Sequence, residues 1–235
     1  MKKIFIYSDE GAGDFSLYSA RSYFSADNIE LISAEQIIKN GIPKTIDLFV
    51  MPGGADRPYA KKLNGAGNDA IQHYVEQGGT YLGICAGGYY GCASIEFQKD
   101  SPHAICEERE LAFCSGTAIG CLPDITKKPY DQTLESAAVT KINIQGKHLP
   151  TLYWGGCYFK VSDTQDIDII ATYCDLPHEP PAIICCKAGK GQAILSGVHF
   201  EISGTNLIDY DFDNNMDNRL KQDLAEKLGA KIEVI

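Results

Sequence analysis

The first half of the chain alternates short apolar runs with segments of helical periodicity, and this alternation limits the available folds more than any other feature. Segments with helical spacing lie at residues 13–27, 35–42 and 61–79. Between them are four apolar runs, KIFIYS (3–8), NIELISA (28–34), DLFVMPGG (47–54) and TYLGICA (80–86). Strands that alternate with helices form βαβ units, whose strands are parallel. The sequence therefore predicts an α/β fold built on a parallel sheet.

The second half has a different pattern, with strand-like stretches separated by turn residues. Gly189 to Gly191 joins two apolar runs in the manner of a hairpin, which predicts antiparallel strands added in the C-terminal half. Leucines at four-residue steps predict a closing amphipathic helix over residues 217–230. Because no repeat or linker interrupts the chain, we interpret residues 1–235 as a single domain. The strand-like stretches are residues 111–120, 137–161, 166–174 and 182–201.

Charge and composition narrow the partners and the compartment. A formal net charge of -10 disfavours nucleic acid and anionic membranes, which leaves a small-molecule substrate or ligand, or a partner protein. The apolar run at residues 4–7 is too short for a signal peptide, and no segment reaches the ~20 apolar residues that span a bilayer. Nine cysteines without a CxxC pair are typical of reduced, buried thiols. We therefore expect a cytoplasmic protein with no metal and no cofactor.

One cysteine stands apart, in the stretch YLGICAGGYYG at residues 81–91. A nucleophile on a sharp strand-to-helix turn needs small neighbours, and Cys85 is surrounded by glycines and Ala86. The turn would place Cys85 at the amino end of a helix expected over residues 87–97, where the helix dipole favours a thiolate. A small residue that merely fits a tight corner is the alternative, so a nucleophilic Cys85 needs a partner.

The partner of a catalytic thiol is usually a histidine that a third group orients. His199 ends the apolar strand AILSGV, and Glu201 follows two residues later, so both side chains emerge on one side of an extended backbone. We predict Cys85 as nucleophile, His199 as base and Glu201 as orienting acid, with a surface carboxylate as the alternative for Glu201. The remaining histidines are interpreted as solvated: His73, His103, His148 and His178.

The stretch MPGGAD predicts an oxyanion hole. It follows the third strand, so the N–H groups of Gly53 and Gly54 are expected to converge with that of Ala86 on an oxygen above Cys85. A plain tight turn at the two glycines is the alternative. Large side chains near these glycines could wall a pocket, although aromatic residues of this kind more often belong to a core. The candidate pocket residues are Asp56, Arg57, Tyr89 and Trp154.

These motifs, in this order, resemble a known family. GICAGG after a strand, PGG one βα unit earlier and a late GVHFE are similar to the class I glutamine amidotransferase-like superfamily. The succession PGGADRPYAKKLNGAGNDAIQHYVEQGGTYLGICAGGYYG, ELAFCSGTAIG, YWGGCYF and AILSGVHFE resembles the amidotransferase-like domain at the amino terminus of fungal biotin-protein ligases, also found as stand-alone bacterial proteins. The resemblance implies a flavodoxin-like, doubly wound, mostly parallel sheet. It also implies the same nucleophile, base, acid and oxyanion residues.

The resemblance has limits that bear on the reaction. Glutaminases of the superfamily carry glutamine where this chain has Tyr89, and often proline where it has Phe200. Biotin ligases of the family hold their adenylate with a glycine- and arginine-rich loop, and no run like GRGRRG occurs in these 235 residues. The likeness is thus to the ligase's companion domain, and biotin ligation is not expected.

Three functions remain from the sequence. The first is a cysteine-dependent hydrolase or amidotransferase acting on an amide or ester of an unidentified small molecule. The second is a catalytically silent ligand-binding or regulatory module that keeps the fold and pocket. The third is a peptidase-like or glyoxalase-like enzyme, in which the thiol pairs with a carboxylate of the first βα unit, Asp9 or Glu10. For these two residues a solvated loop is the alternative.

Overall fold

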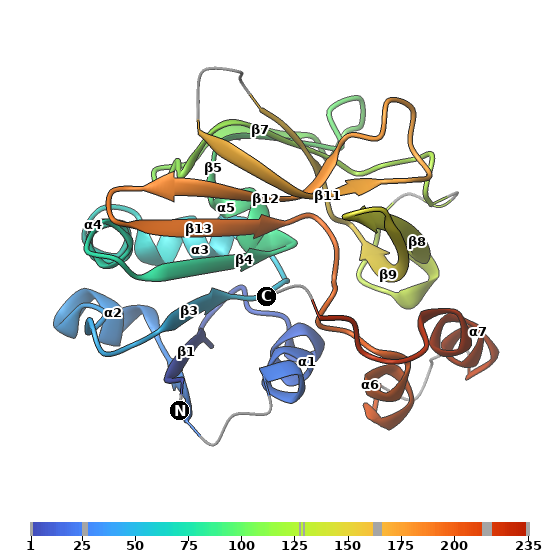
Figure 1. Cartoon of the computed structure of the whole chain (residues 1–235), viewed down its shortest axis with the longest axis horizontal. Coiled ribbons are helices and arrows are strands. Elements are labelled where there is room, and N and C mark those ends of the chain that lie inside the picture. Colours follow the sequence, from blue (N-terminus) through green and yellow to red (C-terminus); the bar gives the residue numbers. More distant parts are fainter. Residues whose placement is uncertain are drawn as a thin grey trace.

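The computed structural model describes residues 2–24, 28–126, 128, 130–161, 166–212 and 218–233. Its main element is a nine-stranded mixed sheet with the order β2-β1-β3-β4-β13-β12-β11-β8-β9 (Figure 1). Strands from β2 to β13 are parallel to their neighbours, and those from β12 to β9 are antiparallel. The prediction of a parallel sheet with antiparallel strands added in the C-terminal half is therefore confirmed.

The strands of this sheet come from both halves of the chain. Its first half supplies β1 (Ile4–Tyr7), β2 (Ile29–Ile32), β3 (Leu48–Met51) and β4 (Thr80–Ile84). Its second half supplies β8 (Ala137–Ile144), β9 (Lys147–Trp154), β11 (Ile167–Tyr173), β12 (Pro181–Ala188) and β13 (Gly191–Ser196). The β12–β13 hairpin closes between Ala188 and Gly191, where the glycines predicted it. Because β13 pairs in parallel with β4, the ends of these two strands meet at one edge.

Helices cover both faces of the parallel strands because successive side chains alternate between the faces. Phe5, Tyr7 and Phe49 face one core, which also holds buried residues of α2 to α5. Ile4, Ile6 and Val50 face the other, with α1. The helices are α1 (Asp14–Phe24), α2 (Ala34–Asn40), α3 (Asp56–Leu63), α4 (Ala66–Glu76), α5 (Ala86–Tyr90), α6 (Gly204–Asp209) and α7 (Asn218–Leu228). Residues 25–27 and 217, within the ends expected for the first and last helices, lie outside the described residues.

A second, four-stranded sheet packs against the same core as α5. Its order is β10-β7-β5-β6, with β5 (Cys92–Phe97), β6 (Ile105–Glu108), β7 (Cys114–Gly120) and β10 (Tyr158–Lys160). The expectation of a helix over residues 87–97 was wrong, because α5 ends at Tyr90 and the chain continues as β5. Strand pairing explains the difference, since Ile95 and Phe97 suit a strand and β5 pairs with both β6 and β7.

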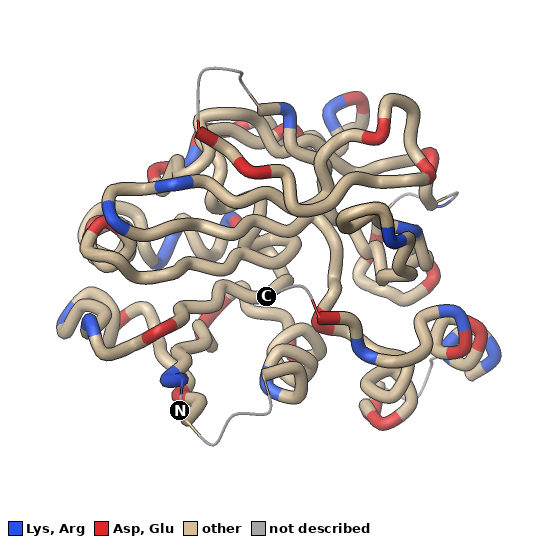
Figure 2. Tube along the Cα trace, viewed as in Figure 1, with Lys and Arg blue, Asp and Glu red and all other residues tan. Residues whose placement is uncertain are grey.

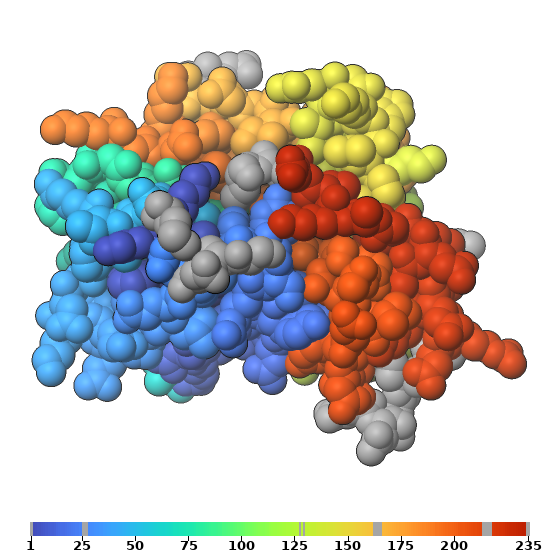
Figure 3. Space-filling view, turned by 60° about the horizontal axis from the view of Figure 1, so that its bottom comes forward, coloured from blue at the N-terminus to red at the C-terminus, as the bar shows by residue number. Residues whose placement is uncertain are grey.

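The N-terminal and C-terminal regions of the described chain pack against each other. In Figure 3 the blue N-terminal region adjoins the orange and red C-terminal region, and the ring centroids of Phe15 in α1 and Tyr210 after α6 are 4.7 Å apart. The strand β6 and the helices α3 and α6 were not predicted, and a one-turn 3-10 helix also lies at Leu134–Ser136. Acidic and basic residues are interspersed along the trace (Figure 2). Among the described residues, no helix is both long and apolar enough to cross a membrane.

Candidate functional site

Cys85 lies at the sharp turn between β4 and α5. Its backbone has φ 50 and ψ −107, a left-handed φ that is uncommon outside glycine and marks a strained turn. The turn is held by hydrogen bonds from Cys85 N to Ser196 O (2.8 Å) and from Tyr89 N to Cys85 O (2.9 Å). A Cβ on Gly87 would come within 2.1 Å of Met51 O, so only glycine lets α5 approach β3 this closely. The glycines therefore position the thiol, as the sequence predicted for this corner.

His199 and Glu201 follow β13, the strand beside β4. The N–H of His199 donates to Leu152 O at 2.8 Å, which fixes the backbone after β13. Nδ1 of His199 lies 2.8 Å from Oε1 of Glu201, and both residues are buried. Because Glu201 occupies Nδ1, the opposite ring nitrogen, Nε2, is the one left for another partner. The structure thus brings His199 and Glu201 together as the sequence pattern predicted.

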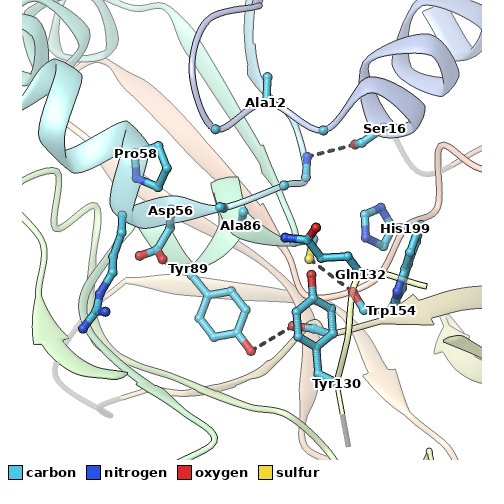
Figure 4. A pocket seen from close by; sticks show the side chains of 18 of the residues that line it. Ala12, Ser16, Asp56, Pro58, Ala86, Tyr89, Tyr130, Gln132, Trp154 and His199 are labelled. Carbon is cyan, nitrogen blue, oxygen red and sulfur yellow. Dashed lines mark hydrogen bonds between the residues drawn. The ribbon is translucent and has the colours of Figure 1, made fainter. Parts of the chain in front are cut away.

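Ser16 is a further member of this group that the sequence did not indicate. Its hydroxyl donates to Glu201 Oε1 at 3.0 Å. It also accepts a hydrogen bond from Gly53 N at 2.8 Å (Figure 4). Ser16 belongs to the first turns of α1, directly after the glycine-containing loop that ends β1. A serine in the first turn of a helix at the carboxyl edge of a parallel sheet is a weak signal for a site residue. Many serines without a functional role occur at such positions.

The electrostatics of His199 follow from its neighbours. Burial by itself lowers the pKa of the imidazole, because it penalises the charged form. The charges of Glu201 and Cys85, with hydrogen bonds to both, act in the opposite direction and raise the pKa of His199 well above its usual value. A positive imidazolium is therefore favoured between the Glu201 carboxylate and the Cys85 sulfur.

Of the three N–H groups expected to form the oxyanion hole, one is already hydrogen-bonded within the protein and two are not. The N–H of Gly53 already donates to Ser16, so the expectation that Gly53 contributes to an oxyanion hole is corrected. Position 53 requires glycine for a different reason, because a Cβ there would lie 2.6 Å from Cε1 of His199. The N–H groups of Gly54 and Ala86 donate no hydrogen bond to any described residue, and both residues face the cavity described next. They remain the candidate donors.

A cavity of about 620 Å³ opens above Cys85. This size is within the range of small-molecule sites. Figure 4 shows Asp56, Tyr89, Trp154 and His199 around this space, together with Tyr130 and Gln132, which the sequence did not indicate. All four predicted pocket residues lie on its lining, as does Cys85. The lining comprises Gly11 to Ser16, Gly53 to Pro58, Cys85, Ala86, Tyr89, Ile95, Phe97, Ile105, Tyr130, Gln132, Trp154, Gly155, His199 and Ile202.

Asp9 and Glu10 are turned away from this cavity. Asp9 accepts hydrogen bonds from the backbone N–H groups of Glu10 and Ala34, and Lys62 lies 3.7 Å from both carboxylates. Neither residue lines the cavity. The pairing of the thiol with a carboxylate of the first βα unit is therefore contradicted by the geometry.

Tyr89 and Trp154 line the cavity and also make hydrogen bonds that hold neighbouring elements together. The Tyr89 hydroxyl donates to Gly156 O at 2.7 Å, which ties α5 to the turn after β9, and burial raises its pKa well above the usual value. Trp154 donates from Nε1 to Ser136 Oγ at 3.2 Å, and its carbonyl oxygen lies 3.5 Å from Cys85 Sγ. Both residues thus belong to the core as well as to the pocket.

An ion-pair network lies beside the cavity at the start of α3, where Asp56 and Arg57 are lining residues. Arg109, itself buried, donates through Nε to Asp56 Oδ2 at 2.8 Å and through Nη2 to Glu107 Oε2 at 2.9 Å. Arg57 is more exposed and binds the other oxygen of Glu107. Burial raises the pKa of Asp56, and Arg109 offsets part of that effect. Within the described chain, no cluster of three His, Cys, Asp or Glu residues has the arrangement of a metal site.

The fold is similar to that of a glutamine amidotransferase of known structure. A glutamine amidotransferase from Thermotoga maritima matches 96% of this chain and 90% of its own, with a TM-score of 0.56 and 12% identity. At that identity the likeness concerns the fold alone. More specifically, the chain belongs to the family described as "Biotin-protein ligase, N terminal", whose model matches residues 2–235.

Two curated relatives agree with the family. An uncharacterized protein of Chlamydia muridarum is 34% identical over 213 residues, which cover 86% of this chain and 81% of the relative. The biotin–protein ligase of Schizosaccharomyces pombe is 32% identical over 189 residues, which cover 77% of this chain. The match spans only 30% of that ligase's length. The relationship is therefore to one part of the ligase.

Proposed function

We propose that this protein is a cysteine-dependent hydrolase or amidotransferase that acts on an amide or ester of a small molecule. The observation that best supports this is that Cys85 and His199 line a ligand-sized cavity and that Glu201 is paired with His199 behind it. In this proposal Cys85 is the nucleophile, His199 the base, and Glu201 the acid that orients the imidazole. Ser16 acts through Glu201 and is a positioning residue.

The reaction begins with the proton of the Cys85–His199 pair already on Nε2 of His199, and the sulfur of Cys85 bonds to the substrate carbonyl carbon. The electron pair of the C=O π bond moves to the oxygen, which the N–H groups of Gly54 and Ala86 stabilise. When the C=O bond re-forms, the bond to the amine or alcohol breaks and His199 returns the proton to that leaving group. Water, deprotonated by His199, then cleaves the thioester and restores the thiol. The net reaction consumes one water per bond cleaved.

Selective alkylation tests whether Cys85 is an activated nucleophile. At about pH 6.5 an ordinary thiol is only about 1% ionised, so alkylation at this pH distinguishes an ordinary thiol from a nucleophile that a neighbouring histidine assists. We expect iodoacetamide to label Cys85 about tenfold faster than the exposed Cys106. Peptide mass spectrometry measures the two labelling rates. His199→Ala should remove the difference, and the matched change of an exposed histidine, His73→Ala, should preserve it. Equal labelling of Cys85 and Cys106 in the wild type would refute an activated thiol.

Turnover is tested on the same protein. Amides and esters are screened for thioester formation on Cys85 and for product release, with glutamine first. Cys85→Ala should abolish both signals. A substrate that forms the acyl-enzyme and is released as a carboxylic acid identifies hydrolytic turnover. Transfer of the ammonia released from an amide to an acceptor, and not its release to solvent, identifies an amidotransferase.

A ligand-binding module without turnover is the second candidate, and Tyr89 favours it. Glutaminases with this fold have glutamine at this position, whereas here the Tyr89 hydroxyl is fixed to Gly156 O and the ring is part of the cavity wall. This candidate requires a compound that raises the melting temperature of wild type and Cys85→Ala equally and is recovered unchanged. Consumption of the compound by the wild type alone would exclude it.

A further inference from the structure

The cavity contains a second polar group besides the thiol, the carboxylate of Asp56. Asp56 follows Gly54 by two residues, so their Cα atoms are at most about 7 Å apart. The carboxylate of Asp56 points from the start of α3 into the same space as Tyr89 (Figure 4). A compound whose carbonyl oxygen rests on Gly54 and Ala86 would therefore reach Asp56 with a group only a few bonds away.

Asp56 is only half satisfied by the protein. Its Oδ2 accepts from Nε of Arg109 at 2.8 Å and lies 2.6 Å from Nη2 of the same residue. Its Oδ1 accepts no hydrogen bond from any described residue. The side chain is only 13% exposed, so the second oxygen has little access to water other than through the cavity. A carboxylate oxygen that faces the cavity without a protein partner is stabilised by an N–H donor of a ligand, and most strongly by a charged one.

The cations near the cavity are already paired. Among the described lining residues Arg57 is the single lysine or arginine, and it donates both Nε and Nη2 to Glu107. Arg109 is shared between Asp56 and Glu107. A ligand carboxylate would meet Asp56 and the exposed Asp14, which also lines the cavity, with no uncommitted lysine or arginine beside it. The imidazolium of His199 lies across the cavity from Asp56 (Figure 4) and is paired with Glu201, so the end of the cavity at Asp56 favours an amine and disfavours a free carboxylate.

The small sheet supplies an apolar wall opposite the polar end. Ile95 and Phe97 of β5 and Ile105 of β6 line the cavity. The ring of Phe97 packs edge-on against Tyr89 at 5.9 Å and against Tyr130 at 5.5 Å between centroids. Aromatic and branched side chains of a ligand gain both apolar burial and ring contacts on such a surface.

From these features we infer that Asp56 binds a protonated amine of the substrate. The substrate class is an amide or ester of an amino acid with an aromatic or branched side chain, in which the carboxyl group is not free. This inference rests on the proposed function and names the substrate class of the same site. Free glutamine does not fit it, because its α-carboxylate would lie near Asp56 with no uncommitted lysine or arginine to bind.

Binding to Cys85→Ala tests the inference without any chemistry at the thiol. L-phenylalaninamide and N-acetyl-L-phenylalaninamide share the ring and carboxamide, but only the first carries a cationic amine at about pH 6.5. By isothermal titration calorimetry we expect the amine to bind about tenfold more tightly or better than the acetylated compound. Asp56→Asn on the same background should reduce the ratio to about threefold or less, and the matched change of an exposed carboxylate, Asp69→Asn, should preserve it.

The outcomes separate this inference from the proposed function. Equal affinities, tighter binding of the acetylated compound, no binding of either at millimolar concentration, or an unchanged ratio in Asp56→Asn would each overturn it. If Asp56→Asn does not fold, the ratio of the two compounds on Cys85→Ala still decides. A normal ratio with an unreactive Cys85 supports amine binding and refutes the hydrolase, whereas a reactive Cys85 with equal affinities refutes the substrate class alone.

Discussion

Replacing Ser16 with alanine removes the hydroxyl that joins Gly53 to Glu201. Its two hydrogen bonds, of 3.0 Å to Glu201 Oε1 and 2.8 Å from Gly53 N, are both buried. A hydrogen bond to a charged group contributes about 1.5–3 kcal/mol, and a buried N–H without a partner costs about 1–3 kcal/mol. Because one hydroxyl serves both bonds, the effects are not simply additive. We expect the free energy of unfolding in urea to fall by about 2–4 kcal/mol.

Ser19 provides a matched control one turn along α1. It is fully buried, and its Oγ has no hydrogen-bond partner among the described residues. Ser19→Ala should therefore leave the free energy of unfolding within about 0.5 kcal/mol of the wild type or raise it. Ser16→Ala should also slow the alkylation of Cys85, because the Glu201 carboxylate that orients His199 loses a partner. Equal stability losses in the two variants, or a Ser16→Ala protein as stable as the wild type, would refute this reasoning.

Three further predictions concern the residues around the cavity. Gly53→Ala should slow Cys85 alkylation, measured by mass spectrometry, because its Cβ would meet Cε1 of His199 at 2.6 Å and displace the ring. Arg109→Gln should lower the free energy of unfolding in urea by about 3–5 kcal/mol, since it leaves Asp56 buried without its cation. Arg57→Gln, which changes an exposed pair, should cost less than about 1 kcal/mol, and similar losses in both variants would contradict the burial argument. The third concerns pH: burial lowers the pKa of His199, but the charges of Glu201 and Cys85 raise it overall, so the imidazolium stabilises the fold. That contribution is complete below about pH 6.5 and is lost as pH rises through the folded-state pKa, so the stability advantage of wild type over His199→Gln in urea should shrink toward about pH 9. A constant advantage across this range would show that the raised pKa is absent.

The parallel part of the fold could be predicted because its signals are local. The apolar runs at residues 3–8 and 47–54 are buried on both faces, so they read as strands without any knowledge of their neighbours. His199 and Glu201 were also predicted to lie together, but the reason given was wrong: β13 ends at Ser196, and residues 200–201 form a turn in which Ile202 N donates to His199 O, not extended backbone. The glycines around Cys85 mark a tight corner in the sequence itself.

Features that depend on distant pairing could not be predicted in this way. The stretch after Tyr90 was expected to continue as a helix, but pairing with β7, about twenty residues later, makes it a strand. The hydroxyl of Ser16 acquires its role only when α1 meets Glu201, 185 residues away. The reason for glycine at position 53 is also tertiary, because the space it leaves is filled by the His199 ring.

Residues from both sheets line the cavity, but the two sheets contribute different kinds of residue. Cys85 and His199 stand at the ends of β4 and β13 in the large sheet, whereas Ile95, Phe97 and Ile105 come from the small one. Substitutions in the small sheet change the size and polarity of the cavity lining without moving the Cys85 thiol or the His199 imidazole. Selection can therefore alter which compound this scaffold accepts through a few positions in β5 and β6, while the costly strained turn at Cys85 is inherited unchanged.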